Sequence, residues 1–179
     1  RNGERVNYDD FTHAADDKQV IGNGIPKCYA GWNNNFRYKN FDLSITMRGA
    51  FGFQILNGAR MNYENTKNSR VENRLKSVTH KVFGKVPLSK EVEPEYNSYY
   101  IEDGDYWKID NITLGYTFGK VGKYIKSIRL YGSVLNALTL TGYDGVDPEV
   151  STAGLTPGYD RRDSYPSIRS FTFGVGVKF

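Results

Sequence analysis

Acidic residues in two short segments are the first candidates for chemistry in this chain, because grouped carboxylates can coordinate Ca²⁺. One segment is Asp103-Gly-Asp105, and the other is Asp144-Gly-Val-Asp147-Pro-Glu149. Neither matches the twelve-residue pattern of an EF-hand loop, and their Gly and Pro residues fit ordinary turns equally well. A turn and a calcium site therefore both stay open, and the sequence assigns no metal ligand.

Groups able to perform covalent catalysis do not combine into a recognisable pattern. His13 and His80 are isolated, and Cys28 has no evident activating partner, so a nucleophilic mechanism is unsupported. Glycoside hydrolysis needs two carboxylates on either side of the scissile bond, and no such pair stands out. The basic segment 67–85 lacks the interleaved aromatic residues typical of nucleic-acid binding. We therefore predict no catalytic residue, no enzyme activity, no cofactor and no nucleic-acid partner.

Aromatic residues offer a second kind of site, because ring faces stack against the apolar faces of sugars. The segment Glu95-Tyr-Asn-Ser-Tyr-Tyr100 is rich in them, and it leads into Tyr106 and Trp107. The same rings would serve equally well in an interfacial girdle or a loop cluster. Six residues are predicted to contact a substrate or a covering partner: Tyr96, Tyr99, Tyr100, Trp107, Tyr143 and Tyr159.

The end of the chain predicts the kind of element that positions these residues. Residues 171–179 alternate between an apolar set, which begins with Phe171 and ends with Phe179, and a set of Thr, Gly and Lys. A period of two places the apolar set on one face of an extended strand. Bacterial outer-membrane barrels typically end in such a strand with a final aromatic residue, and their strands alternate lipid-facing and lumen-facing side chains.

Five segments show this alternation and predict an all-β protein. The expected strands span about 29–38, 41–56, 105–118, 127–139 and 168–179. Several reach the ~9–11 residues that a strand needs to cross a bilayer. The connections 39–40 and 119–126 are short, whereas 57–104 and 140–167 are long. Short turns on one side and long extracellular loops on the other are the plan of an outer-membrane barrel.

Composition leaves a second fold open. A charged fraction of 25% and the absence of any run of ~18 apolar residues also fit a soluble protein. The alternative is a non-enzymatic soluble or surface carbohydrate-binding β-sandwich, although turn signals in sandwiches recur every ~8–12 residues and the connection 57–104 is far longer. Five strands cannot close a barrel, since the smallest bacterial ones have eight, so we expect further strands upstream of this chain.

Several motifs together resemble one family. They are Ile21–Trp32, Asn35–Ile45, Asp105–Phe118, Leu140–Val150 and Tyr165-Pro166 before the terminal strand. In this order and spacing they resemble the C-terminal end of SusC/RagA-type TonB-dependent transporters of Bacteroidetes. The resemblance runs from about residue 18 to residue 179, and the loop 57–104 departs most from the family pattern.

This resemblance implies a 22-stranded antiparallel transmembrane β-barrel in the bacterial outer membrane, of which residues 1–179 form the C-terminal five strands. Family members actively import glycans or peptides with a SusD-like surface lipoprotein, driven by the TonB complex. The plug and the TonB-contacting segment are expected outside this chain. Within the loop 57–104, Val71, Leu75, Val78 and Val82 recur at helical spacing, which predicts a short amphipathic helix, either packed on the lid partner or solvated.

In such a barrel the polar faces of the strands would meet the lumen and the apolar faces would meet outer-membrane lipid. The lumen-facing side chains would line water, plug or solute, and packing against the plug is the simpler role. Phe179 is expected to act as the C-terminal assembly signal. The residues expected to face the lumen are Asp42, Ser44, Thr46, Arg48 and Arg129.

Overall fold

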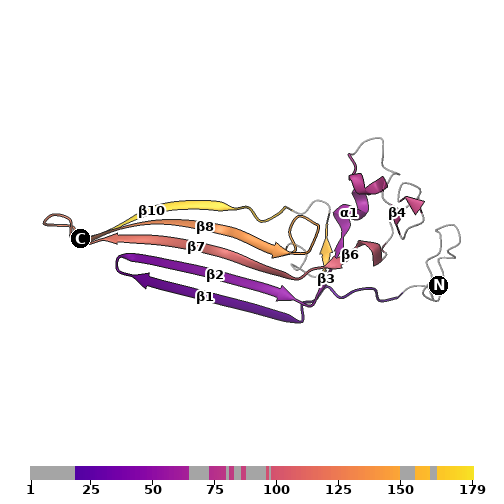
Figure 1. Cartoon of the computed structure of the whole chain (residues 1–179), viewed down its shortest axis with the longest axis horizontal. Coiled ribbons are helices and arrows are strands. Elements are labelled where there is room, and N and C mark those ends of the chain that lie inside the picture. The colour runs from indigo at the N-terminus through magenta and orange to yellow at the C-terminus, as the bar shows by residue number, and fades with distance from the viewer. Residues whose placement is uncertain are drawn as a thin grey trace.

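The computed structural model is mainly antiparallel β-structure, with five long strands in one sheet (Figure 1). It describes residues 19–64, 73–79, 81–82, 86–87, 96, 98–149, 156–161 and 165–179. The strands are β1 (Cys28–Tyr38), β2 (Phe41–Phe51), β7 (Tyr106–Phe118), β8 (Ser127–Thr141) and β10 (Ser170–Lys178). Their order is β1-β2-β7-β8-β10, so each long strand pairs with the next one along the chain, and β1 and β10 are the edges.

The register of the strands gives the sheet one apolar face. Because neighbouring side chains of a strand point to opposite faces, apolar residues at alternate positions line up across the sheet. Three rows cross all five strands: Tyr38-Phe41-Tyr116-Leu130-Val175, Phe36-Leu43-Leu114-Gly132-Phe173 and Asn34-Ile45-Ile112-Val134-Phe171. The positions between them carry mainly polar residues and glycine, and they form the opposite, polar face.

No second layer covers the apolar face within the described part of the chain. Phe173 is 84% exposed and Leu114 is 52% exposed. The smaller sheets lie beyond the ends of the long strands rather than against their faces (Figure 1). A β-sandwich would bury these rows between two sheets, so the sandwich alternative does not describe this arrangement.

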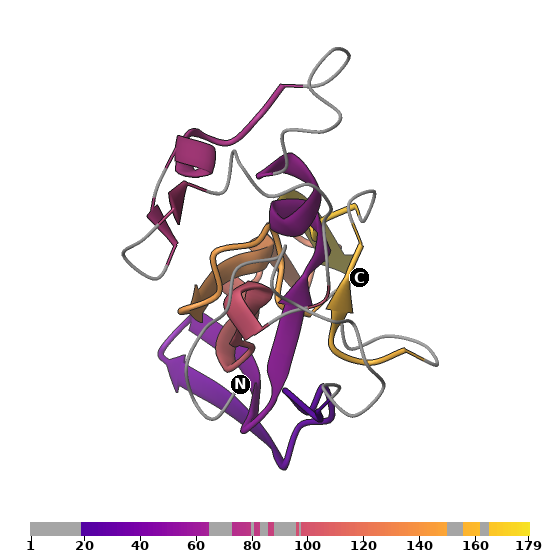
Figure 2. The same ribbon diagram turned by 90° about the vertical axis from the view of Figure 1, so that its right-hand side faces the viewer.

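The two long connections leave the same end of the sheet, here called the loop end, and the short turns lie at the other, the turn end (Figure 1). A three-stranded sheet at the loop end joins β6 (Ile101–Asp103), β3 (Gln54–Asn57) and β9 (Tyr159–Asp160). Viewed from this end, α1 (Gly58–Tyr63) stands in front of the long strands (Figure 2). The remaining elements are 3-10 helices at Lys76–Thr79 and Ser98–Tyr100 and the pair β4 (Lys81–Val82) and β5 (Val86–Pro87).

The main apolar core is also at the loop end. Ala50, Phe53, Ile55, Tyr106 and Tyr143 form one buried cluster. A second cluster contains Met61 and Tyr100, with Leu56 and Tyr99 packed against it. The loop end is therefore a folded structure attached to the strand ends, although its segments read as loops in the sequence.

The strand expected over 41–56 is wrong at its C-terminal end. β2 ends at Phe51, and Gly52 has a φ of +75°, a conformation that glycine adopts without strain. The Gly52 amide donates a hydrogen bond to Asp105 Oδ1 at 2.5 Å, which holds this break. The chain resumes as β3 in the other sheet. The other four long strands lie within two residues of the expected bounds.

The amphipathic helix expected from Val71, Leu75, Val78 and Val82 is also wrong where the structure describes it. Lys76–Thr79 is a single 3-10 turn, and Lys81–Val82 is a short strand paired with Val86–Pro87. Val71 lies outside the described residues. A helical spacing over four apolar residues is a weak signal in a loop, because turns and short strands accommodate it equally well.

One extra residue in β7 reverses the faces of that strand. Thr46 of β2 pairs with Asn111 and Met47 pairs with Ile109, so Asp110 has no partner in the ladder. Such a bulge moves every side chain beyond it to the opposite face. Trp107 therefore lies opposite Gly49 on the apolar face, whereas uninterrupted alternation would place it on the polar face with Asn111.

Candidate functional site

The polar face of the sheet carries the residues that the sequence predicted to face a lumen. Asp42, Ser44, Thr46 and Arg48 alternate along β2 with its apolar row, and Arg129 lies on the same face of β8. The structure brings the five side chains together on one surface with further polar groups.

Asp42 and Arg129 contact each other across an intervening strand. Arg129 Nε donates to Asp42 Oδ1 at 3.0 Å, and Arg129 Nη2 donates to Oδ2 at 2.5 Å. Gly115 of β7 lies beneath the pair, and a Cβ atom there would come within 2.6 Å of both side chains. The guanidinium also lies 5.0 Å from the centre of the Tyr131 ring, which covers Gly174 of β10. Two glycines thus leave room for a connected polar layer.

Hydroxyl and amide groups continue this layer in the middle of the sheet. Ser133 Oγ donates to Asn111 Oδ1 at 2.7 Å, and Thr113 Oγ1 donates to the same oxygen at 3.3 Å. The row through Thr113 and Ser133 reaches Ser44 on one side and Thr172 on the other. Satisfied polar groups of this kind are suited to a surface that meets water or another polar chain.

A second charged cluster lies at the loop end of the polar face. Lys108, only 1% exposed, donates from Nζ to Glu149 Oε2 at 2.7 Å and to Ser167 Oγ at 3.1 Å. Arg48 donates from Nε to Asp110 Oδ2 at 2.6 Å and also pairs with Glu149. Glu149 therefore fastens the segment that follows β8 to two neighbouring strands of the sheet.

The carboxylates considered as calcium ligands act as hydrogen-bond acceptors in turns. Asp103 Oδ1 accepts from the Asp105 amide at 3.2 Å. Asp147 accepts from the amides of Glu149 and Ser167, both at 3.0 Å. Burial alone would raise the pKa of Asp147, but its hydrogen bonds from Ser167 and Glu149 outweigh that effect and lower it. Among the described residues, no three acidic, His or Cys side chains are grouped as a metal site.

A partly buried polar network joins the elements of the loop end. Glu102 accepts from Asn57 Nδ2 at 3.2 Å, from Arg60 Nη1 at 2.8 Å and from the Asp144 amide at 3.0 Å. Arg60 also donates to Glu64 at 2.9 Å. Although burial would lower the pKa of Arg60, the hydrogen bonds to Glu64 and Glu102 raise it. This network holds α1, β6 and the segment after β8 together.

Tyr143 connects the same region to β9. Its hydroxyl donates to Asp160 Oδ2 at 2.6 Å, and the ring belongs to the main core. Burial, together with the carboxylate of Asp160, raises the pKa of Tyr143 well above its ordinary value. The hydroxyl is therefore neutral at physiological pH and acts as a structural donor.

The six aromatic residues predicted as contact sites separate into three groups. Tyr100 and Tyr143 are buried at 4% and 5% exposure, so their rings pack inside the chain. Trp107 stacks on Phe51 at 6.1 Å on the apolar face. Tyr96 is 69% exposed and approaches Tyr159 at 6.4 Å, and Tyr99 lies 4.5 Å from the Arg60 guanidinium. Of the six, Tyr96 is exposed and Tyr99 and Tyr159 are partly exposed at the loop end.

Sequence reasoning missed Lys108, Glu149 and Gly115 as parts of the polar layer. Lys108 carries the clearest signal, because a lysine between Trp107 and Ile109 indicates a polar face within a strand. The role of Gly115 depends on side chains from two other strands, so no local pattern shows it. No helix in the described part of the chain is long and apolar enough to span a membrane.

Comparison with known proteins shows which proteins this chain is similar to. No protein-family model matches the chain. It is 32% identical over 176 residues to "TonB-dependent receptor P3" of Formosa agariphila, covering 91% of this chain and 17% of that protein. It is 27% identical to "TonB-dependent receptor SusC" of Bacteroides thetaiotaomicron, covering 91% of this chain and 16% of that protein. The chain is homologous to SusC/RagA-type TonB-dependent receptors.

Solved structures agree with this homology at the level of the fold. The chain superimposes on part of the RagAB peptide importer in its closed-closed state with a TM-score of 0.75 at 21% identity, covering 90% of this chain and 18% of that chain. A second structure, of the RagAB peptide transporter, gives 0.75 at 22% identity, covering 89% and 18%. The chain spans about a sixth of the length of the curated relatives that it matches.

Proposed function

We propose that this chain is part of the wall of an outer-membrane β-barrel that actively imports nutrients and performs no bond chemistry itself. The observation that carries the proposal is the pair of unlike faces on one antiparallel sheet, apolar through all five strands on one side and polar on the other. The homology to TonB-dependent receptors supports the same interpretation. In a lipid environment the apolar face needs no second layer of protein.

Closure of the barrel requires further strands. Among the described strands, β1 and β10 each have one edge without a partner strand, and backbone groups left unpaired in hydrocarbon are strongly disfavoured. We propose that the other strands of a 22-stranded barrel pair with both edges, and that residues 1–179 form the C-terminal part of that barrel. The plug and the TonB-contacting segment would then belong to other parts of the protein.

The aromatic residues support an orientation across the membrane. Phe41 packs on Tyr116 at 4.6 Å at the turn end, and Phe51 packs on Trp107 at the loop end. The two phenylalanines are ten positions apart in β2, which corresponds to a distance of about 33 Å at a rise of ~3.3 Å per residue. A tilt of about 40° reduces this to ~25 Å, the height of the apolar band of such barrels. We place the loop end outside the cell and the turn end, with Phe179, in the periplasm.

The polar face would line the lumen in this orientation. Asp42, Arg129, Arg48 and Lys108 are engaged with partners within the sheet or in the segment that follows β8. Paired charges make a stable wall against which a plug can pack, whereas an unpaired charge would be expected in a group that binds cargo tightly. We therefore assign packing to these residues rather than substrate selection.

The homology supports a proposal for the partners of the whole protein. The relatives include SusC and the RagAB peptide importer, which supports a SusD-like surface lipoprotein as partner and TonB as the source of energy. We propose that Tyr96, Tyr99 and Tyr159 at the loop end contact the lipoprotein or the substrate. Uptake competition between oligosaccharides and peptides, measured in cells that produce the whole protein, would identify the substrate class.

Neighbouring residues on opposite faces of β2 provide the test of the barrel assignment. Ile45→Arg places a charge on the apolar face, where it costs about 2–4 kcal/mol at the bilayer midplane. Thr46→Arg places the same charge one residue away on the polar face. We expect Ile45→Arg to reduce the heat-modifiable, protease-resistant form in outer membranes and Thr46→Arg to leave it near the wild-type amount. Equal assembly of the two variants would rule out contact of this face with lipid.

A further inference from the structure

The turn end of the sheet carries a strong excess of positive charge. Its segments 36–44, 114–131 and 174–179 contain seven Lys and Arg residues but only one acidic side chain, Asp42. Asp42 is engaged by Arg129. Within the described part of the chain, no carboxylate pairs with the three lysines of the β7–β8 turn, Lys120, Lys123 and Lys126. This turn therefore presents three positive charges that no carboxylate of the described residues neutralises, at one end of the apolar face.

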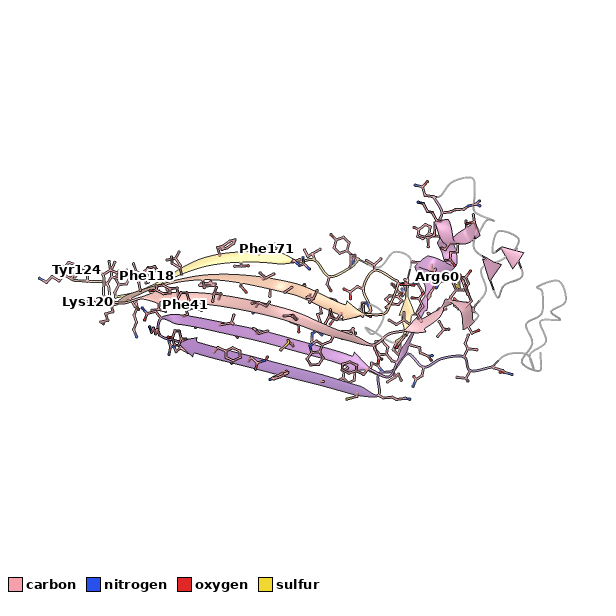
Figure 3. All side chains as sticks on the ribbon, viewed as in Figure 1. Phe41, Arg60, Phe118, Lys120, Tyr124 and Phe171 are labelled. Carbon is pink, nitrogen blue, oxygen red and sulfur yellow. The ribbon has the colours of Figure 1, made fainter. Side chains whose placement is uncertain are left out.

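The same turn also presents apolar groups. Tyr124 is 77% exposed and Val121 is 44% exposed. Lys120 and Tyr124 project beyond Phe118 and Phe41 at the tip of the sheet (Figure 3). Exposed rings beside lysines are suited to the boundary between lipid headgroups and hydrocarbon, because lysine stems can reach outward to charged headgroups.

A shallow groove of about 640 Å³ adjoins this region on the apolar face. Gly132 forms its floor, between Leu114 of β7 and Phe173 of β10 in the same row. Phe41, Tyr116, Leu130 and Val175 form the next row toward the turn end, and all six side chains line the groove. Leu130 of β8 lies four residues after Lys126, which immediately precedes the strand, or about 13 Å away at the rise of an extended chain.

The glycine at this position is not required by crowding. A Cβ atom on Gly132 would meet only the Phe173 ring, at 3.4 Å, which is an ordinary contact. Glycine weakens a strand interior, and it often marks a place where another molecule approaches closely. The neighbouring positions of the row are bulky, so the missing side chain leaves a gap that an acyl chain can fill.

We propose that this groove and the β7–β8 turn form a binding site for an anionic phospholipid of the periplasmic leaflet, an inference that rests on the proposed membrane function. One acyl chain lies over Gly132, between the rings of Tyr116 and Phe173. The phosphate group is bound by Lys120, Lys123 and Lys126. Charge complementarity selects an anionic headgroup over a zwitterionic one, and the position at the turn end selects phospholipid over the lipid of the outer leaflet.

The test uses the whole protein purified from outer membranes in detergent and a fluorescent phosphatidylglycerol as probe, with labelled phosphatidylethanolamine for comparison. Substituting Lys120, Lys123 and Lys126 together by Gln should weaken phosphatidylglycerol binding about a hundredfold, since each lysine near an anionic surface contributes about a factor of five. Gly132→Val should weaken it several-fold by filling the groove. Lys76→Gln at the loop end and Ala30→Val on the apolar face of β1 are the matched controls.

The outcomes separate this site from the barrel assignment. Selective phosphatidylglycerol binding that both site variants weaken, and both controls retain, supports the proposal. Equal binding of the two phospholipids, or unchanged binding in either site variant, overturns it even when heat-modifiable mobility shows an intact barrel. Stronger displacement of the probe by lipid A than by unlabelled phosphatidylglycerol also overturns it. A protein that stays soluble without detergent would contradict the barrel itself, which is a different failure.

Discussion

Asp42 of β2 and Arg129 of β8 form a bidentate ion pair over the backbone of the strand that separates them. The strand between is β7, and Gly115 is the residue beneath the pair. Any side chain at position 115 would occupy the space that the two charged groups share. The contact therefore joins three strands near the turn end, and it depends on the identity of a residue that takes no direct part in it.

Because the ion pair depends on Gly115, we can predict how it responds when alanine replaces this glycine. In the wild type, a double-mutant cycle with Asp42→Asn and Arg129→Gln should give a coupling of about 0.5–1 kcal/mol, since both side chains are partly exposed. In a Gly115→Ala background the coupling should fall to about zero, because the new Cβ displaces both groups. Denaturant unfolding in detergent measures all variants. The control is Gly119→Ala, which should preserve the coupling because a Cβ atom at position 119 meets no atom within 4 Å. A coupling that survives Gly115→Ala would show that the ion pair does not need the glycine.

Lys108 and Glu149 should respond unequally to removal of either partner. Glu149→Gln removes the negative charge that is paired with the buried Lys108 ammonium, which should cost about 3 kcal/mol. Lys108→Met should cost less, because it removes the buried charge and Glu149 keeps its contact with Arg48. Thermal unfolding midpoints of the two variants provide the comparison. Equal or reversed midpoint shifts would contradict a buried, charged Lys108 held by Glu149.

The hydrogen bond from Tyr143 to Asp160 predicts a difference at high pH. Burial raises the pKa of Tyr143, so its stabilising contribution is fully present below the unfolded value of about 10 and falls progressively as the pH rises from there toward the folded value. Tyr143→Phe should lower stability by about 1–2 kcal/mol at neutral pH. The difference in stability between the wild type and Tyr143→Phe should disappear progressively above pH 10. Unfolding midpoints measured from pH 7 to 11 provide the comparison. A gap that stays constant over this range would contradict the pKa shift.

Removal of Phe179 tests its assignment as an assembly signal. The residue follows the end of β10 and is 74% exposed, so its loss removes little packing within this sheet. We expect the deletion to slow insertion into the outer membrane, followed by pulse-chase of the heat-modifiable form, with the final stability almost unchanged. Phe179→Tyr, which keeps an aromatic end, should insert at close to the normal rate. Insertion of the deletion variant at the wild-type rate would refute the assignment.

Periodicity in the sequence determined most of the sheet. Apolar residues at every second position of 41–51 and 171–179 have only one arrangement in which they share a face, so the strands and their two faces could be predicted locally. The motifs along the chain likewise indicated the TonB-dependent receptor family, and the homology confirms it. The same local patterns failed at Gly52 and at the described segments Lys76–Thr79 and Lys81–Val82, where turn geometry decides between elements and apolar spacing carries little information.

Tertiary structure alone decided which side chains work together. The bulge at Asp110 moves Trp107 from the expected polar face to the apolar face, because one unpaired residue reverses the alternation of the strand. Burial removes Tyr100 and Tyr143 from the predicted contact surface, since each packs against segments far away in sequence. Asp42 finds Arg129 at a separation of 87 residues, over Gly115. Such partners depend on the register of three strands at once, and no single stretch of sequence contains that information.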